Sequence, residues 1–72
     1  MYYYVYVIQS LLSKDLYIGY TTDLKQRISE HNSGKGAQTT RRKGQWKLIY
    51  FEGYLSQKDA LGREKFLKGG SG

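Results

Sequence analysis

The residues best suited to chemistry in this chain are two tyrosines, Tyr6 and Tyr17. Each lies in a short run of tyrosine and β-branched residues, and a short polar connection separates the two runs. This pattern predicts a β-hairpin that holds the two phenols near each other on adjacent strands. A phenol has an ordinary pKa of ~10, so it acts as a base at neutral pH only where cationic neighbours lower its pKa. The alternative is that both rings fill the core of a small sheet.

Two further chemical groups, Arg27 and His31, lie on the helix predicted to follow the hairpin. Their spacing of four residues makes them neighbours on the helix surface. Arg27 could lower the pKa of a phenol or contact a phosphate, or it could be solvated. His31 continues the apolar stripe of Leu24 and Ile28, a position where a histidine is either a core or capping group or a proton carrier.

Glu64 is the most informative acidic residue. It follows Ala60 by four residues and precedes Leu67 by three, which places it on or beside the helix stripe that should face the sheet. A carboxylate in such a place is costly unless it is paired or binds a cation. Two alternatives follow: a metal site, or an ion pair with Arg63, Lys68 or a basic residue of the first helix.

Three strands and two helices must position these groups. We expect strands at residues 2–8, 16–20 and 46–51, and helices at about 22–32 and 56–68. The first strand is apolar or aromatic on both faces, which predicts a central strand covered on both sides. Glu52 and Gly53 are expected to end the third strand.

The helix ends carry capping signals. Thr21 or Thr22 is expected to cap the first helix, with Asp23 in its first turn and Gly34 just beyond its end.

In the second helix, Ser56 and Asp59 match a capping box, and Leu55 could pack on Ala60 as a hydrophobic staple. This helix should present an apolar stripe to the sheet that consists of Ala60, Leu61, Phe66 and Leu67.

Composition limits the function further. The 72 residues predict one domain at 1–68 with a flexible tail at 69–72, and 12 basic against six acidic residues give a net charge of +6. That charge favours nucleic acid as a partner ahead of a membrane surface. The absence of cysteine and the single histidine exclude disulfides, thiolate-ligated metals and a multi-histidine cage. No apolar run approaches the ~20 residues of a membrane span, so we expect a cytoplasmic protein.

The segment from Asn32 to Gln45 has no hydrophobic period and no acidic residue. Its basic side chains are expected to contact nucleic acid, unless they only form a solvated surface. They are Lys35, Arg41, Arg42 and Lys43.

Several motifs occur together in one order. They are Tyr4-Val5-Tyr6, Tyr17-Ile18-Gly19, the pair Arg27 and His31, and the runs at 30–37 and 60–65. On these motifs the chain resembles the GIY-YIG nucleases, and most closely their small stand-alone bacterial members. The resemblance covers nearly the whole chain, and the order and spacing of five blocks make it specific.

The resemblance implies an α+β fold, a three-stranded antiparallel sheet flanked by helices. It also implies an endonuclease that hydrolyses phosphodiester bonds in DNA, in repair or processing, with one Mg²⁺ or Mn²⁺ ion. In that mechanism Glu64 binds the metal, Tyr6 or Tyr17 activates or positions water, and Arg27 holds the phosphate. His31 moves a proton or holds the tyrosine. DNA is expected ahead of RNA.

The chain departs from the family pattern in two places. Tyr4 replaces the glycine of the first motif, and no asparagine follows Glu64, where larger members have one in a further helix. Weak activity is therefore one expectation. Two other functions remain open: a non-catalytic nucleic-acid-binding module, and an adaptor that pairs through a sheet edge.

Overall fold

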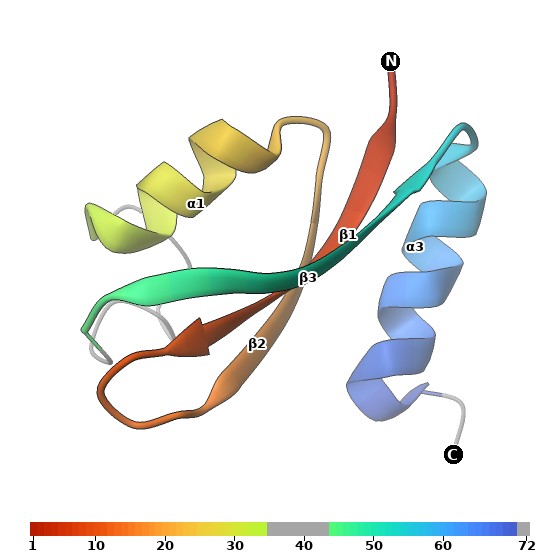
Figure 1. Ribbon diagram of the computed structural model, residues 1–72. Helices are drawn as coiled ribbons and strands as arrows, with labels where there is room; N and C mark the ends of the chain where they lie inside the picture. The colour runs from red at the N-terminus through yellow and green to blue at the C-terminus, as the bar shows by residue number, and fades with distance from the viewer. Residues whose placement is uncertain (35–43, 71–72) are drawn as a thin grey trace.

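The computed structural model describes residues 1–34 and 44–70. In chain order the elements are β1 (Tyr3–Ser10), β2 (Leu16–Thr21), α1 (Leu24–Asn32), β3 (Trp46–Tyr54), α3 (Gln57–Lys65) and a final π-helical turn, η1 (Phe66–Gly70). The strands form one antiparallel sheet in the order β2-β1-β3. Figure 1 shows the sheet with α1 on one side and α3 on the other. The expected α+β fold is confirmed.

β1 is the central strand, as its two apolar faces predict. Tyr6 pairs with Gly19 on β2, and the preceding residue Val5 pairs with Tyr20. Side chains alternate along a strand, so Tyr6 lies on one face of the sheet and Val5 on the other.

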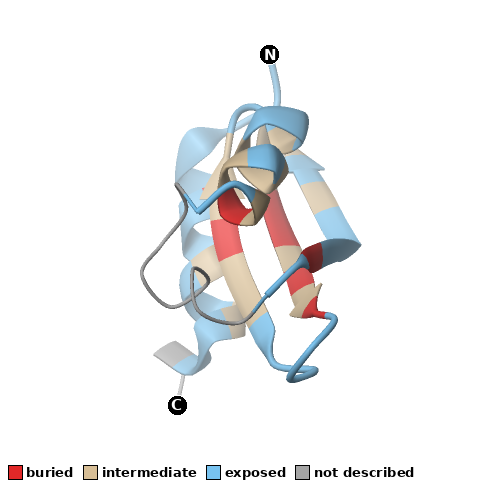
Figure 2. Cartoon of the chain, turned by 90° about the vertical axis from the view of Figure 1, so that its left-hand side faces the viewer, coloured by how far each residue is buried: buried red, intermediate tan, exposed pale blue. Residues whose placement is uncertain are grey.

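The main core lies between α1 and the sheet, where Figure 2 shows buried residues on the helix and on the strands behind it. The predicted stripe of α1 is confirmed, because His31 is buried and Leu24 and Ile28 pack against the core cluster. The cluster consists of Tyr6, Ile8 and Trp46, and Tyr17 also packs against it.

The face of the sheet that α3 covers is packed by few apolar side chains. Among the residues of α3, all of them described, Ala60 alone is buried, and Leu61 is 43% exposed. In η1, Phe66 is 52% exposed and Leu67 is half-buried. The predicted apolar stripe is therefore confirmed at Ala60 and in part at Leu67, and is wrong at Leu61 and Phe66. The hydrophobic staple is also wrong, because Leu55 is 79% exposed.

Polar contacts from β3 replace the missing apolar stripe. Arg63 donates to both carboxylate oxygens of Glu52, from Nε to Oε1 at 3.0 Å and from Nη2 to Oε2 at 3.2 Å. The hydroxyls of Tyr50 and Tyr54 donate to the same carboxylate at 2.6 and 2.7 Å. The guanidinium and these hydroxyls lower the pKa of Glu52 to about 2. We call these four residues the Glu52 clamp.

The clamp explains why the third strand is longer than predicted. Pairing with β1 continues past Glu52 and Gly53 to Tyr54, which lies opposite Tyr3. Sequence patterns suggested a strand end because an acid and a glycine disfavour strands. The carboxylate is tolerated in the strand because Arg63 neutralises its charge and two tyrosine hydroxyls donate hydrogen bonds to it.

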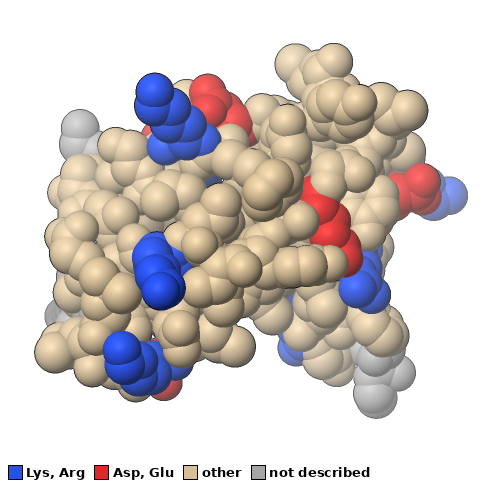
Figure 3. Space-filling model, in the orientation of Figure 1, with Lys and Arg blue, Asp and Glu red and all other residues tan. Residues whose placement is uncertain are grey.

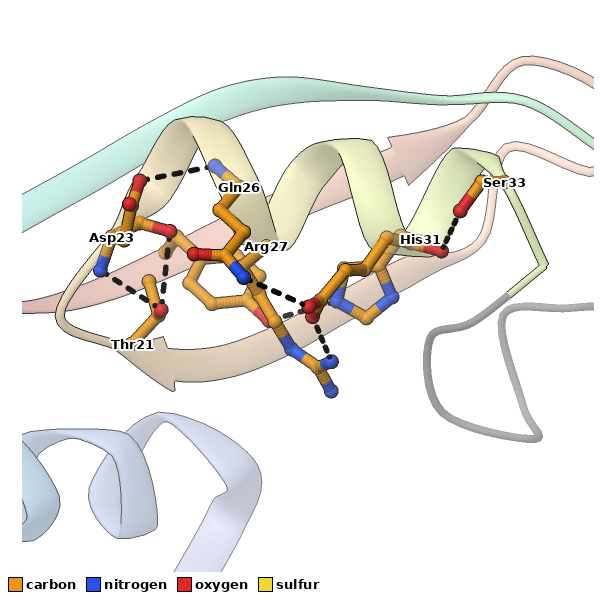
Figure 4. Close-up of polar contacts among 8 residues, drawn as sticks. Thr21, Asp23, Gln26, Arg27, His31 and Ser33 are labelled. Carbon is orange, nitrogen blue, oxygen red and sulfur yellow. Dashed lines mark hydrogen bonds and ion pairs between the residues drawn. The ribbon is translucent and has the colours of Figure 1, made fainter.

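The start of α1 corrects one prediction. Asp23, not Thr21 or Thr22, is the N-cap, and its Oδ1 accepts from the backbone N–H of Gln26 at 3.0 Å (Figure 4). Thr21 is still paired in β2, and its hydroxyl accepts from the N–H of Asp23 at 3.1 Å. Gly34 follows the helix with φ of +85°, which agrees with the predicted terminal glycine.

The caps of α3 agree with the sequence at one end. Ser56 is the N-cap, and its hydroxyl accepts from the N–H of Asp59 at 3.3 Å. At the other end Gly69 has φ of +87° within the final turn. The predicted tail at 69–72 thus overlaps this turn, and residues 71–72 lie outside the described residues.

One amide joins the end of α1 to the start of β3. Asn32 accepts from the N–H of Trp46 at 2.7 Å and donates to its carbonyl at 3.0 Å. The predicted nucleic-acid contacts Lys35, Arg41, Arg42 and Lys43 lie outside the described residues. None of the described helices combines the length and hydropathy needed to span a bilayer.

The Glu52 clamp predicts how stability depends on pH. The pKa of Glu52 is about 2 in the folded protein, whereas the ordinary pKa of a glutamate is 4.5. The ionised Glu52 therefore stabilises the fold fully above pH 4.5, and this stabilisation is lost as the pH falls toward 2. Glu52→Gln should therefore flatten this part of the stability profile, measured by urea unfolding at several pH values. At neutral pH we expect a loss of roughly 1 kcal/mol, as for a partly exposed ion pair.

The control is Asp59→Asn, which removes an exposed carboxylate from the first turn of α3. A wild-type slope between pH 4.5 and 2 in Glu52→Gln would show that the clamp does not carry this dependence.

Candidate functional site

The predicted site residues that are described come together along β2. Tyr6 and Tyr17 share the face covered by α1, and Tyr17 pairs with Ile8, two residues along β1 from Tyr6. Both rings lie against the imidazole of His31, with ring centroids 5.9 Å away for Tyr6 and 5.1 Å for Tyr17. The hairpin therefore brings the phenols together around His31.

Gly19 makes the position of Tyr6 possible. A Cβ atom added at Gly19 would lie 2.3 Å from Oη of Tyr6, closer than real atoms approach. The phenol thus crosses directly over the backbone of β2. The group that approaches this glycine closely is thus a side chain of the same domain.

Beyond Gly19 the phenol meets the imidazole. Tyr6 Oη lies 2.8 Å from His31 Nε2, and both residues are buried. Burial, and then the charge of Arg27, lower the pKa of His31 below its ordinary value of 6.5. The imidazole is therefore neutral at pH 7.

The pKa of Tyr6 moves opposite to the sequence-based expectation. Arg27 lowers it through a hydrogen bond and through its charge, but burial is the larger effect and raises it to about 12. Tyr6 is therefore a neutral phenol at pH 7. A guanidinium can only donate, so the phenol oxygen is the acceptor toward Arg27, whereas the donor toward Nε2 of His31 is set by the tautomer of the imidazole.

Arg27 completes this network at the surface. Figure 4 shows its side chain reaching from α1 across β2. Its Nη1 donates to Glu30 Oε1 at 2.8 Å, and this contact raises the pKa of Arg27 and lowers that of Glu30. Sequence reasoning missed Glu30 as the partner, although its spacing of three residues from Arg27 is a signal for such a pair.

Glu64 reaches the same region from the other helix. Its side chain is 19% exposed, and its Oε2 lies 2.9 Å from Nζ of Lys68. That ammonium lies 5.9 Å from the ring centroid of Tyr17, and the charge of Glu64 contributes to the raised pKa of Tyr6. The carboxylate is therefore linked to Tyr17 through Lys68, and its charge acts on Tyr6.

This arrangement resolves which ion pair Glu64 makes. Of the partners that the sequence left open, Lys68 pairs with Glu64, whereas Arg63 pairs with Glu52. The ion pair does not exclude a metal site. It shows that a cation is already accommodated beside this carboxylate.

The donor set at Glu64 suits a hard cation that keeps most of its water. In residues 1–34 and 44–70 no group of three or more His, Cys, Asp or Glu side chains could hold a metal. An ion bound by Glu64 would thus take most ligands from water and phosphate, as Mg²⁺ commonly does. Carboxylate oxygen suits Mg²⁺ and Mn²⁺.

A family model decides the relationship. The model of the GIY-YIG catalytic domain matches residues 2–72. The chain belongs to the GIY-YIG family. Members of this family are generally endonucleases that use divalent metal ions.

Relatives of this GIY-YIG domain are UPF0213 proteins. The one from Streptococcus pneumoniae serotype 4 is 46% identical over 65 residues, which are 90% of this chain and 65% of the relative. A UPF0213 protein from Haloquadratum walsbyi is 42% identical over 67 residues, 93% of this chain and 74% of that protein. The chain thus spans just under two thirds of the length of the S. pneumoniae relative.

A solved structure agrees with the fold. The solution NMR structure of the UPF0213 protein BH0048 from Bacillus halodurans aligns with a TM-score of 0.58 at 38% identity. The alignment covers 94% of this chain and 71% of the other. The expected kinship with small GIY-YIG proteins is confirmed.

The packing of Tyr6 on Gly19 predicts an asymmetry between two glycines. Gly19→Ala should displace the phenol, break its bond to His31 and cost about 1–3 kcal/mol, as in other overpacked cores. Gly62→Ala is the matched control, because Gly62 is in a helix and, apart from its chain neighbours and the nearby helix backbone, no atom lies within 4 Å of its added Cβ. This control should gain about 0.5–1 kcal/mol. Urea unfolding measures both, and equal effects would contradict the packing.

The lowered pKa of His31 can be measured directly, because it is the single histidine of the chain. Titration of its imidazole by NMR should give a midpoint below 6.5. Since the folded pKa is below the unfolded one, this group's contribution to stability is complete above pH 6.5 and declines as pH falls through the folded pKa. A midpoint at or above 6.5 would mean that burial and the charge of Arg27 do not hold the imidazole neutral.

Proposed function

We propose that this GIY-YIG domain is a divalent-metal-dependent endonuclease that hydrolyses phosphodiester bonds in DNA, in repair or processing. The observation that supports it most is the convergence of Tyr6, His31 and Arg27 with Glu64. These groups come from the sheet and from helices on both of its sides. A structural core alone does not require a guanidinium and a carboxylate beside a buried phenol.

Arg27 is proposed to bind the scissile phosphate. Its side chain is 30% exposed and carries a permanent charge, held in place by Glu30. A positioned guanidinium stabilises the charge that develops on the phosphate oxygens in the transition state.

Tyr6 and His31 are proposed to act as one proton path. A phenol with a pKa of about 12 does not ionise at pH 7, so Tyr6 orients the attacking water and accepts its proton only as its own proton passes to Nε2 of His31. The proton then rests on the imidazole. Tyr17, whose ring also contacts the imidazole of His31, is proposed to position water or substrate.

Glu64 is proposed as the protein ligand of one Mg²⁺ or Mn²⁺ ion. Such an ion, when bound, polarises a phosphate oxygen and lowers the pKa of bound water. The contribution of this chain is a fixed carboxylate next to the phenols.

The DNA is proposed to lie along the β2 edge. On the face drawn in Figure 3, which has β3 in front, Lys and Arg side chains are scattered singly among uncharged and acidic ones. The described residues form no basic track on that face. From the sequence alone we propose that Lys35, Arg41, Arg42 and Lys43 contact phosphates, and such contacts would not read base sequence.

Cleavage of branched and single-stranded DNA with Mg²⁺ or Mn²⁺ tests this function. Glu64→Gln and Arg27→Gln should each lower the rate by about 10²–10³, the loss typical of removing one group that stabilises the transition state. Lys25→Gln is the control for Arg27, because it removes an exposed charge from the same helix. It should retain near-wild-type cleavage.

The same assay distinguishes the other functions. DNA binding that weakens steeply with salt, without products at any metal concentration, would identify a non-catalytic binding module. Salt-insensitive association with a protein, and no DNA binding, would identify an edge-pairing adaptor.

A further inference from the structure

We propose that the ammonium of Lys68 occupies the cation position at Glu64 when no metal is bound, so that a metal ion must displace Lys68. This inference rests on the proposed function, because it concerns the same carboxylate. Its chemistry is competition between two cations for one anion, and it needs no covalent step.

The contacts of Lys68 separate it from an ordinary surface pair. An exposed pair four residues apart on a helix contributes little and is easily broken. Here Nζ lies 2.9 Å from Glu64 Oε2, and Glu64 is four-fifths buried. The same ammonium lies over the ring of Tyr17 at 5.9 Å, where the negative face of the ring attracts it. Lys68 thus lies between the carboxylate and a phenol of the site.

The negative charge of Glu64 explains why a cation lies beside it. Without one, Glu64 would be a largely buried carboxylate with no neutralising charge, which is a costly arrangement. Its charge already contributes to the raised pKa of Tyr6. An ammonium at 2.9 Å offsets that cost until another cation arrives.

The position of Lys68 in the fold allows it to leave. It lies in η1, directly before Gly69, whose φ of +87° marks the kink that ends the helix. Its side chain is 48% exposed, so rotation toward solvent opens the carboxylate without unfolding α3. Released in this way, the ammonium would remain near the β2 edge, where the DNA is proposed to lie.

Direct binding of Mn²⁺ tests the proposal without relying on activity. Free Mn²⁺ is measured by electron paramagnetic resonance in titrations of wild type and variants of the full chain. Lys68→Gln should bind Mn²⁺ roughly two- to fivefold more tightly than Lys65→Gln, the range for loss of a competing, partly exposed ion pair.

Lys65→Gln is the matched control because Lys65 is exposed, lies at the end of α3 three residues before Lys68, and its substitution removes the same charge. Lys68→Arg keeps the competing charge and should not tighten binding. In a Glu64→Gln background, Lys68→Gln should have no effect, because the shared anion is gone.

The outcomes separate this inference from the function on which it rests. If Glu64→Gln abolishes Mn²⁺ binding but Lys68→Gln and Lys65→Gln bind alike, competition is refuted and the metal site stands. If Glu64→Gln binds Mn²⁺ as wild type does, the metal assignment fails, and the competition with it. A thermal unfolding profile of Lys68→Gln that matches Lys65→Gln ensures that both variants are compared as folded proteins.

Discussion

The fold and the proposed site both depend on one buried hydrogen bond, between the phenol of Tyr6 and Nε2 of His31. A buried phenol and a buried imidazole each need a polar partner, and here they satisfy each other. Tyr6 is on the central strand and His31 on the last full turn of α1, so this bond also fixes how the helix lies on the sheet. It requires Gly19, since any side chain there would collide with the phenol. The proposed catalytic roles of Tyr6 and His31 therefore rest on the same bond as their structural roles.

The other helix places its carboxylate by a different means. α3 lies across the sheet with Ala60 buried beneath it, and its successive residues Arg63 and Glu64 point toward opposite sheet edges. Arg63 binds Glu52 on β3, and Glu64 pairs with Lys68, whose ammonium lies over the ring of Tyr17 on β2. The Glu52 clamp thus restricts the rotation of α3 about its axis, and with it the position of Glu64. The clamp explains how a helix with little apolar burial can hold the proposed metal ligand in place.

The sequence predicts most of this architecture because its signals are local. Alternation identifies β1 as central, the spacing of Leu24, Ile28 and His31 identifies the buried face of α1, and Ser56 predicts its own cap. What it misses depends on contacts between distant residues. The exposure of Leu55 and Phe66, the extension of β3 and the choice of Arg63 for Glu52 all arise from how α3 meets the sheet. The raised pKa of Tyr6 is missed for the same reason, because it reflects burial that no spacing reveals.

That raised pKa constrains any mechanism at this site. A bound phosphodiester would bring further negative charge beside Tyr6, which opposes formation of a phenolate even more strongly. In the proposed mechanism the phenol serves as a base only if its own proton leaves at the same time, and the nearby atom that could receive it is Nε2 of His31. Arg27 acts at both ends of this proposed path. Burial, and then the charge of Arg27, keep the imidazole neutral, and the same charge would offset negative charge at the phenol oxygen. A lysine at that position would supply the charge but not the several fixed donors that contact Glu30 and Tyr6 together.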